Sequence, residues 1–227
     1  MRVRVAATAL GITAALLSLS ACTHHTTPHA APSKAGNQGG TVHEARALPS
    51  AVLDRRLLDQ SDLGGGYLRT PQRPARHDDV TVVGCPALAR LGADTATGGG
   101  LDFPRKAQTA FTYNDASSPE ISEELYSADA ADLSAGIGRI VDAMTGCPAY
   151  RIIAGTTPLD ITAQQLTPPR VGDEQWSLLL TFSAAGRSTV VKETAIRDGS
   201  LLVVLSGSPT LVDRSLGTAL AKATTAN

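Results

Sequence analysis

Residues 187–206, RSTVVKETAIRDGSLLVVLS, decide the fold of this chain. Between Ser188 and Ile196 the side chains alternate as they do in a strand, with one set directed to each face. Asp198-Gly199 is a strong signal for a tight hairpin. Leu201 to Leu205 is apolar at every position, which indicates a strand that lies centrally in a sheet. We therefore expect two antiparallel strands joined by a short turn.

Elements on either side extend this pair. Trp176 to Phe182 predicts a strand before this pair, and Ala185-Gly186-Arg187 predicts the turn that connects them. Asp160 to Leu166 predicts a further strand, earlier in the chain. Ser208-Pro209 opens a final helix, whose apolar residues are Val212, Leu216, Leu220 and Ala223. A meander of strands closed by a helix predicts an α+β fold: an antiparallel sheet with a C-terminal β-meander and helices packed on one face.

The residues before this meander are patterned less regularly. The pattern from Ser50 to Tyr67 predicts a short helix that ends at a run of glycines. Val80 to Val83 predicts a strand. Cys85 to Leu91 predicts a helical turn with proline in its first positions. Ile121 to Tyr126 fits a strand or a helix, and we favour a strand that pairs with its neighbour, Ala107 to Tyr113. Apolar residues at helical spacing predict an amphipathic helix through Leu133, Ile137, Ile140, Val141 and Met144.

The N-terminal segment has the layout of a secretory signal. Arg2 and Arg4 are followed by an uncharged apolar run, Val5 to Leu17, and then by Leu19-Ser20-Ala21-Cys22. This ending resembles the lipobox of bacterial lipoproteins, which implies cleavage before Cys22 and a diacylglycerol, with acyl chains such as palmitate, on that cysteine. The alternatives are a general secretory signal with an incidental cysteine, and an uncleaved anchor. The run is short for such an anchor, because a spanning helix needs about 20 residues.

Residues 22–48 have the composition of a flexible tether, with almost no large apolar residue. About 26 such residues reach roughly 25–30 Å on average, enough to hold a domain clear of the lipid headgroups. His24, His25 and His29 could bind a metal ion loosely, although a polar linker is the simpler interpretation. We expect residues 49–225 to form one folded domain, lipid-anchored at the extracytoplasmic face of the cell membrane.

Composition excludes one class of partner. Hydrophobic residues make up 42% of the chain and charged residues 18%, which is typical of a globular domain. Loss of Arg2 and Arg4 with the signal would leave 18 basic and 21 acidic residues, a net charge of −3. Basic residues form no cluster, so nucleic acid is not expected as a partner. Arginine outnumbers lysine 16 to 4, which together with abundant alanine and glycine points to a high-GC bacterial source.

Cys85 and Cys147 remain once Cys22 is assigned to the lipid. Outside the cytoplasm such a pair predicts a disulfide, which would stabilise the fold by about 4 kcal/mol through loop entropy. Two free buried thiols are the alternative, and a two-cysteine metal site would lack the close-spaced second ligands of zinc sites. The bridge would join the end of the amphipathic helix to the helical turn at Cys85.

Several short motifs occur in the order of a known family. Leu48-Pro49-Ser50 begins the domain, Cys147-Pro148-Ala149-Tyr150 follows the amphipathic helix, and Gly172-Asp173-Glu174 and Arg197-Asp198-Gly199 flank a Trp-led strand. Together they resemble the PknH-like extracellular domain, which is found in actinobacterial lipoproteins and as the outer sensor domain of a receptor Ser/Thr kinase. Over residues 48–225 the resemblance implies an α+β fold with an antiparallel sheet, a cleft, a ligand-sensing role and no catalysis. Members usually carry two disulfides, whereas this chain offers one pair.

Candidate catalytic groups are scarce. A Gly-x-Ser-x-Gly nucleophile motif is absent, and we interpret Ser206 as part of a helix cap. His77 with Asp78-Asp79 could form an acid–base or metal cluster, but the polar surroundings favour a solvated loop. We predict no enzyme activity, no cofactor and no metal site.

Asp173, Glu174 and Trp176 are the candidate ligand residues. The two carboxylates precede a strand, where a turn with structural Lys or Arg partners is the alternative interpretation. Trp176 is the only tryptophan, and it fits either the core or the wall of a cleft. If it lies at a cleft, its fluorescence should respond to a ligand.

Two functions are compatible with these patterns. The first is a lipid-anchored, ligand-binding or sensor-type module of the cell envelope. The second is an interaction protein that docks on a membrane receptor or a cell-wall enzyme without a small ligand. A hydrolase with a dispersed site is a third and weaker hypothesis. A deep apolar cleft would favour the first function, and an extensive exposed apolar patch would favour the second.

Overall fold

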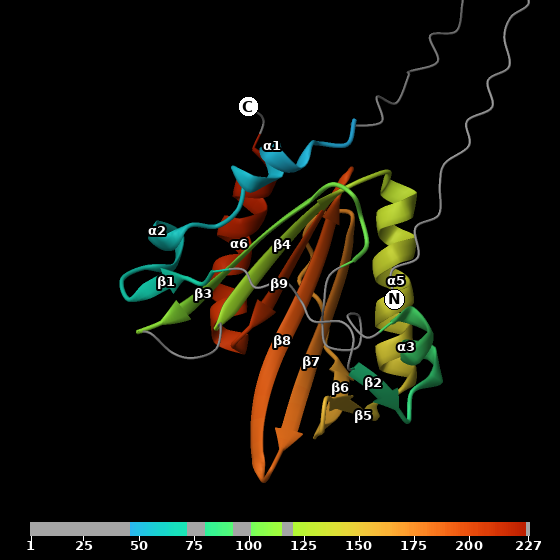
Figure 1. The fold of residues 1–227 in the computed structure, drawn as a ribbon. Coiled ribbons are helices and arrows are strands. Elements are labelled where there is room, and N and C mark those ends of the chain that lie inside the picture. Colours follow the sequence, from blue (N-terminus) through green and yellow to red (C-terminus); the bar gives the residue numbers. More distant parts are fainter. Residues whose placement is uncertain (1–45, 72–79, 93–100, 115–119, 226–227) are drawn as a thin grey trace, which may run out of the picture. The chain divides into compact units, whose positions relative to one another are not determined.

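The computed structural model describes residues 46–71, 80–92, 101–114 and 120–225. Nine strands in these ranges form one antiparallel sheet in the order β1-β3-β4-β9-β8-β7-β6-β5-β2 (Figure 1). The strands are β1 (Tyr67–Arg69), β2 (Val80–Val83), β3 (Lys106–Tyr113), β4 (Ile121–Ser127), β5 (Ala149–Ala154), β6 (Thr157–Gln165), β7 (Glu174–Ala184), β8 (Arg187–Asp198) and β9 (Leu201–Gly207). The helices of the described ranges are α1 (Ser50–Asp54), α2 (Gln60–Leu63), α3 (Pro86–Leu91), α5 (Ala130–Gly146) and α6 (Pro209–Thr224). The predicted α+β fold with an antiparallel sheet is confirmed.

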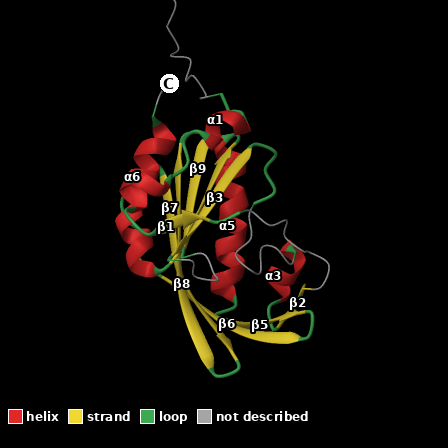
Figure 2. Ribbon diagram, turned by 60° about the vertical axis from the view of Figure 1, so that its left-hand side comes forward, coloured by secondary structure: helices red, strands yellow, loops and turns green. Residues whose placement is uncertain are grey.

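Helices cover both faces of the sheet, and not one face as the sequence analysis predicted (Figure 2). In β9, Leu202 and Val204 pack in a core cluster with α3 and α5, whereas Val203 and Leu205 pack in a second cluster with α1 and α6. Successive side chains of a strand point to opposite faces, so a continuous apolar run needs cover on each side. The run from Leu201 to Leu205 already carried this information.

The hairpin predicted at Asp198-Gly199 is confirmed, but its two loop residues are Gly199 and Ser200, one position later than predicted. Asp198 pairs with Leu201, so Gly199 and Ser200 form the two-residue loop. Gly199 has a φ of +57°, a left-handed conformation that glycine adopts without steric cost. β7, β8 and β9 follow one another as the predicted meander.

Two short helices, α1 and α2, replace the single helix predicted before Gly64. A capping box begins α2, because Asp59 accepts a hydrogen bond from Ser61 N–H and Asp62 accepts one from Asp59 N–H. Gly64 ends the helix with a φ of +94°. The Lys222 ammonium of α6 bridges Asp59 and Asp62 at 2.9 and 2.6 Å. The first helices of the domain are therefore tied to the last one.

The predicted disulfide is confirmed. Cys85 and Cys147 are bonded, with their Cα atoms 5.6 Å apart. Cys85 is the residue before α3, and Cys147 is the residue after α5. The bridge thus joins the amphipathic helix to the short helix, as expected. Strand β5 begins two residues later and was not predicted; it pairs antiparallel to β6.

Several predicted features lie outside the described residues. They are the signal peptide, Cys22, the tether up to residue 45, and His77 with Asp78-Asp79. Within the described ranges, no helix is long and apolar enough to cross a membrane.

Candidate functional site

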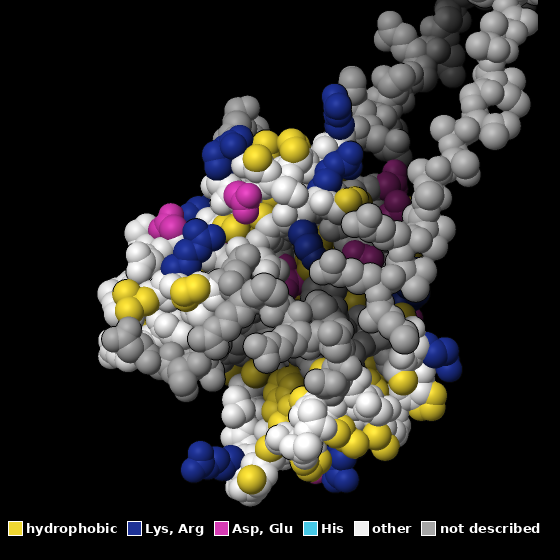
Figure 3. All heavy atoms as spheres, viewed as in Figure 1, with side chains coloured by type: hydrophobic (Ala, Val, Ile, Leu, Met, Phe, Trp, Pro, Cys, Tyr) yellow, Lys and Arg dark blue, Asp and Glu magenta, His cyan; other side chains and the backbone are white. Residues whose placement is uncertain are grey.

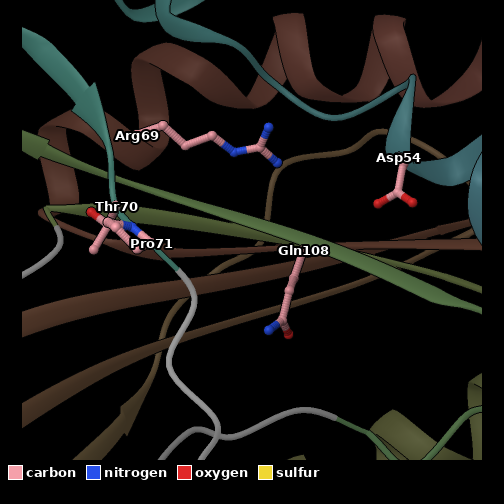
Figure 4. Close-up of a pocket in the computed structure, with 5 residues that line it drawn as sticks. All are labelled: Asp54, Arg69, Thr70, Pro71 and Gln108. Carbon is pink, nitrogen blue, oxygen red and sulfur yellow. The ribbon is translucent and has the colours of Figure 1, made fainter.

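A pocket of about 330 Å³ lies at one edge of the sheet. Its lining consists of Asp54 at the end of α1, Arg69 at the end of β1, the following Thr70 and Pro71, and Gln108 of β3. Figure 4 shows Arg69 and Asp54 on one side of β3 and the Gln108 side chain on the other. The volume falls at the lower end of the range of small-molecule sites.

The pocket exists because β1 is too short to cover β3. The last bond between them runs from Thr70 N–H to the Ala110 carbonyl at 2.8 Å, and the next residue is a proline, which has no N–H with which to continue. At the start of β3, Ser50 Oγ of α1 accepts a hydrogen bond from Lys106 N–H at 3.1 Å. The part of β3 around Gln108 therefore lies between the end of β1 and the start of α1.

Charges of both signs line this pocket. Arg69 and Asp54 are exposed and do not form an ion pair with each other, and neither side chain bonds to another described residue. Thr70 Oγ1 is buried without a hydrogen-bond partner, a state that costs about 1–3 kcal/mol. The pocket thus offers a guanidinium and a carboxylate to a molecule that enters it.

Two acidic side chains, the half-buried Glu124 and the buried Glu193, adjoin the pocket on the α5 side of the sheet. Gln108 lies directly opposite Glu124 in the β3–β4 pair. The Glu124 carboxylate accepts a hydrogen bond from the Tyr126 hydroxyl, which itself accepts one from Leu101 N–H. Burial raises the pKa of Glu193, on β8, to about 7 and also raises the pKa of Glu124, because both carboxylates have left water.

Glu193 is poorly satisfied in this group. Its side chain is 9% exposed, and its Oε2 has no hydrogen-bond partner. The charge of Glu124 adds to the burial that opposes its ionisation. Burying an unpaired carboxylate is costly, and strongly perturbed carboxyl groups are concentrated at functional sites. Glu193 is therefore a candidate functional residue that the sequence analysis did not identify.

A second buried glutamate, Glu123, faces the opposite side of the sheet. It is 0% exposed, its Oε2 accepts a hydrogen bond from Leu58 N–H at 2.6 Å, and its Oε1 has no partner. Burial raises its pKa to about 7, whereas Leu58 N–H and the charge of Lys222 oppose the shift. This carboxyl group holds the loop between α1 and α2 against the sheet, four residues after Asp54 of the pocket.

The predicted ligand residues Asp173 and Glu174 hold the β8–β9 hairpin. Arg197 donates to Asp173 at 2.9 Å and to Glu174 at 3.1 Å, and Asp173 also accepts from Gly199 N–H at 2.8 Å. The Gly199 bond for Asp173 and the Arg197 bond for Glu174 are the main causes that lower the pKa of each carboxyl group. Trp176 packs, partly buried, against the core cluster of α5. None of the three lines the pocket, so their contact with a ligand stays a prediction.

The sequence analysis missed this pocket, because its residues are separated along the chain and each is unremarkable alone. A usable signal was Glu123-Glu124, two carboxylates in the middle of a short strand. Such residues are disfavoured in buried strand interiors unless they have a role. In the described part of the chain, no three His, Cys, Asp or Glu residues are grouped so that they could hold a metal ion.

Comparison with known proteins reveals a shared fold. No protein-family model matches the sequence, and no curated protein matches it. Among solved structures, the extracellular domain of PknH from Mycobacterium tuberculosis is similar, with a TM-score of 0.59 at 11% sequence identity. The match covers 78% of this chain and 97% of that one. At this identity the likeness shows the fold alone, and it confirms the PknH-like fold that the sequence motifs predicted.

Proposed function

We propose that this chain is an extracytoplasmic binding module of the cell envelope, anchored by a lipid on Cys22, which holds a small ligand and does not catalyse a reaction. The pocket at the edge of β3 carries the proposal. It combines an exposed guanidinium, Arg69, with an exposed carboxylate, Asp54, and neither has a partner among the described residues. Polar groups left unsatisfied in the free protein are what a ligand can satisfy.

Two further observations support the location. The lipobox-like ending at Cys22 supports export and anchoring. The fold is shared with a domain described as extracellular. Against a hydrolase, Ser206 lies opposite Glu193 in the β8–β9 pair, and no hydrogen bond joins their side chains in the described structure.

Native mass spectrometry of the full chain, extracted from its own membranes, tests the proposal. We expect a bound molecule on the wild-type protein and its loss from the Arg69→Gln variant, which removes the guanidinium that lines the pocket. The matched control is Arg55→Gln, next to Asp54 but outside the pocket. A wild-type chain that carries no ligand in repeated preparations would contradict the binding role. Turnover of an ester, peptide or glycan that depends on His77 or Ser206 would contradict the non-catalytic role.

A protein partner is the second candidate, favoured by one feature of the surface. Figure 3 shows apolar atoms gathered at the lower end of this face, over β2 and the strands near it. Val83 of β2 is 46% exposed, and β2 lies at the end of the strand order, where a further strand or a partner surface can be added. Cross-linking in intact cells tests this candidate. An envelope protein captured by the wild type and lost with Val83→Lys would favour it over a small ligand.

A further inference from the structure

We infer that the pocket at the edge of β3 recognises a zwitterion: an amino acid, or a short peptide with a free ammonium and a free carboxylate. This inference rests on the proposed ligand-binding function and names the ligand class of the same site. Arg69 binds the carboxylate and Asp54 binds the ammonium.

The position of Arg69 follows from the strand register. Arg69 lies directly opposite Phe111 in the β1–β3 pair, and directly opposite residues project from the same face of a sheet. Phe111 is buried in the cluster formed with α1 and α6. The Arg69 side chain therefore leaves the sheet on the side where α1 and Asp54 lie, as Figure 4 shows. A guanidinium in this position can grip a carboxylate with two parallel hydrogen bonds.

Asp54 has two arginines beside it in the chain, yet it pairs with neither. The Arg55 guanidinium donates to the Ala51 carbonyl at 2.8 Å, and the Arg56 guanidinium donates to the Ala223 carbonyl at 2.7 Å. Both arginines are thus engaged with backbone oxygens. The Asp54 carboxylate keeps no cationic partner among the described residues, although it lines a pocket whose other charged member is Arg69.

The combination of the two charges excludes ligands with a single sign of charge. A dicarboxylate would bring its second negative group towards Asp54, and a diamine would bring its second positive group towards Arg69, so each meets repulsion at one end. Arg69 and Asp54 line the same pocket without forming an ion pair, so both charges are available to a molecule that enters it. A volume of about 330 Å³ suits an amino acid or a dipeptide.

Calorimetric titration of the full chain with four probes tests the inference. Alanine represents a free amino acid, and alanylalanine represents a short peptide. N-acetyl-alanylalanine lacks the ammonium, and alanylalanine amide lacks the carboxylate. We expect one of the two zwitterions to bind, and each blocked dipeptide to bind roughly tenfold more weakly, as the loss of one charge-assisted contact implies. The stronger of alanine and alanylalanine identifies the source.

Variants assign each charge to its residue. The Arg69→Gln variant should bind alanylalanine amide as well as alanylalanine, because it has lost the guanidinium that binds the carboxylate. The Asp54→Asn variant should bind N-acetyl-alanylalanine as well as alanylalanine, because it has lost the carboxylate that binds the ammonium. Arg55→Gln is the matched control, since Arg55 lies next to Asp54 but outside the pocket, and it should keep the wild-type preference. Arg69 and Asp54 are exposed, so unchanged thermal midpoints should confirm that the variants are folded.

The outcomes separate this inference from the proposed function. If the zwitterionic and blocked probes bind equally, or if no probe binds, the inference that the pocket recognises a zwitterion is wrong. A co-purified molecule without opposite charges, found by native mass spectrometry, overturns it as well but leaves the binding function standing. A chain that neither carries a molecule from its own membranes nor binds a probe overturns both.

Discussion

The Glu123→Gln variant should lose less of its free energy of unfolding than the wild type does when the pH is raised. The pKa of this carboxyl group rises from 4.5 to about 7 on folding, chiefly through burial. Between these values the folded chain keeps a proton that the unfolded chain has released, so stability falls as the pH rises. Below pH 4.5 the two states are protonated alike, and above pH 7 the full cost of about 3 kcal/mol applies. Glutamine cannot ionise, but its amide oxygen can still accept the Leu58 N–H.

Urea titrations at pH 5 and pH 8, followed by Trp176 fluorescence, measure this effect. From pH 5 to pH 8 the wild type should lose about 2.5 kcal/mol more of its free energy of unfolding than Glu123→Gln does. Glu193 titrates in the same direction in both proteins, so its contribution cancels in the comparison. Glu120→Gln, at the partly exposed residue just before the same strand, is the control and should behave as the wild type. Equal losses in wild type and Glu123→Gln would show that the reasoning from burial is wrong.

Three further changes have definite expected results. Cys22→Ala should release the protein from the membrane fraction and abolish fatty-acid labelling; an unlabelled variant retained as well as the wild type would remove the anchor from the proposal. Cys147→Ser should lower the free energy of unfolding by about 2–5 kcal/mol in titrations without reductant, and an unchanged value would mean that the bridge adds nothing. Gly66→Ala places a Cβ 2.6 Å from the Tyr113 ring, at a residue whose φ is +92°, so we expect the free energy of unfolding to fall by more than about 1 kcal/mol. A thermal midpoint equal to that of the wild type would contradict this expectation.

The C-terminal half was predictable because its signals are contiguous. The alternation before Ile196, the turn at Gly199 and the proline that opens α6 each depend on residues that are neighbours in the chain. β5 was missed, because Ala149–Ala154 is short and directly follows a helix, so it shows no period of its own. The order of strands was not predicted either, since β1 joins β3 and β2 joins β5 across long separations that no local pattern records.

The candidate site was less accessible to prediction than the fold. Asp173 and Glu174 were chosen as a conspicuous acidic pair, and the structure shows them bonded to Arg197, a partner 23 residues or more away in the chain. No sequence pattern singled out Arg69 or Asp54, because what distinguishes them is that neither side chain has an ion-pair or hydrogen-bond partner among the described residues. Such an absence becomes visible only when the surrounding side chains have been placed.

The last strand of the chain, β9, lies between β4 and β8 in the sheet. Until residues 201–207 are available, the sheet consists of two parts, and each has an open edge where β9 belongs. A chain is made from its N-terminus, so the two parts can form first but cannot be joined until residues 201–207 have been made. A stalled or truncated chain would leave both edges exposed, a state that favours aggregation and proteolysis. The sheet is therefore complete only when β9 has been inserted between β4 and β8.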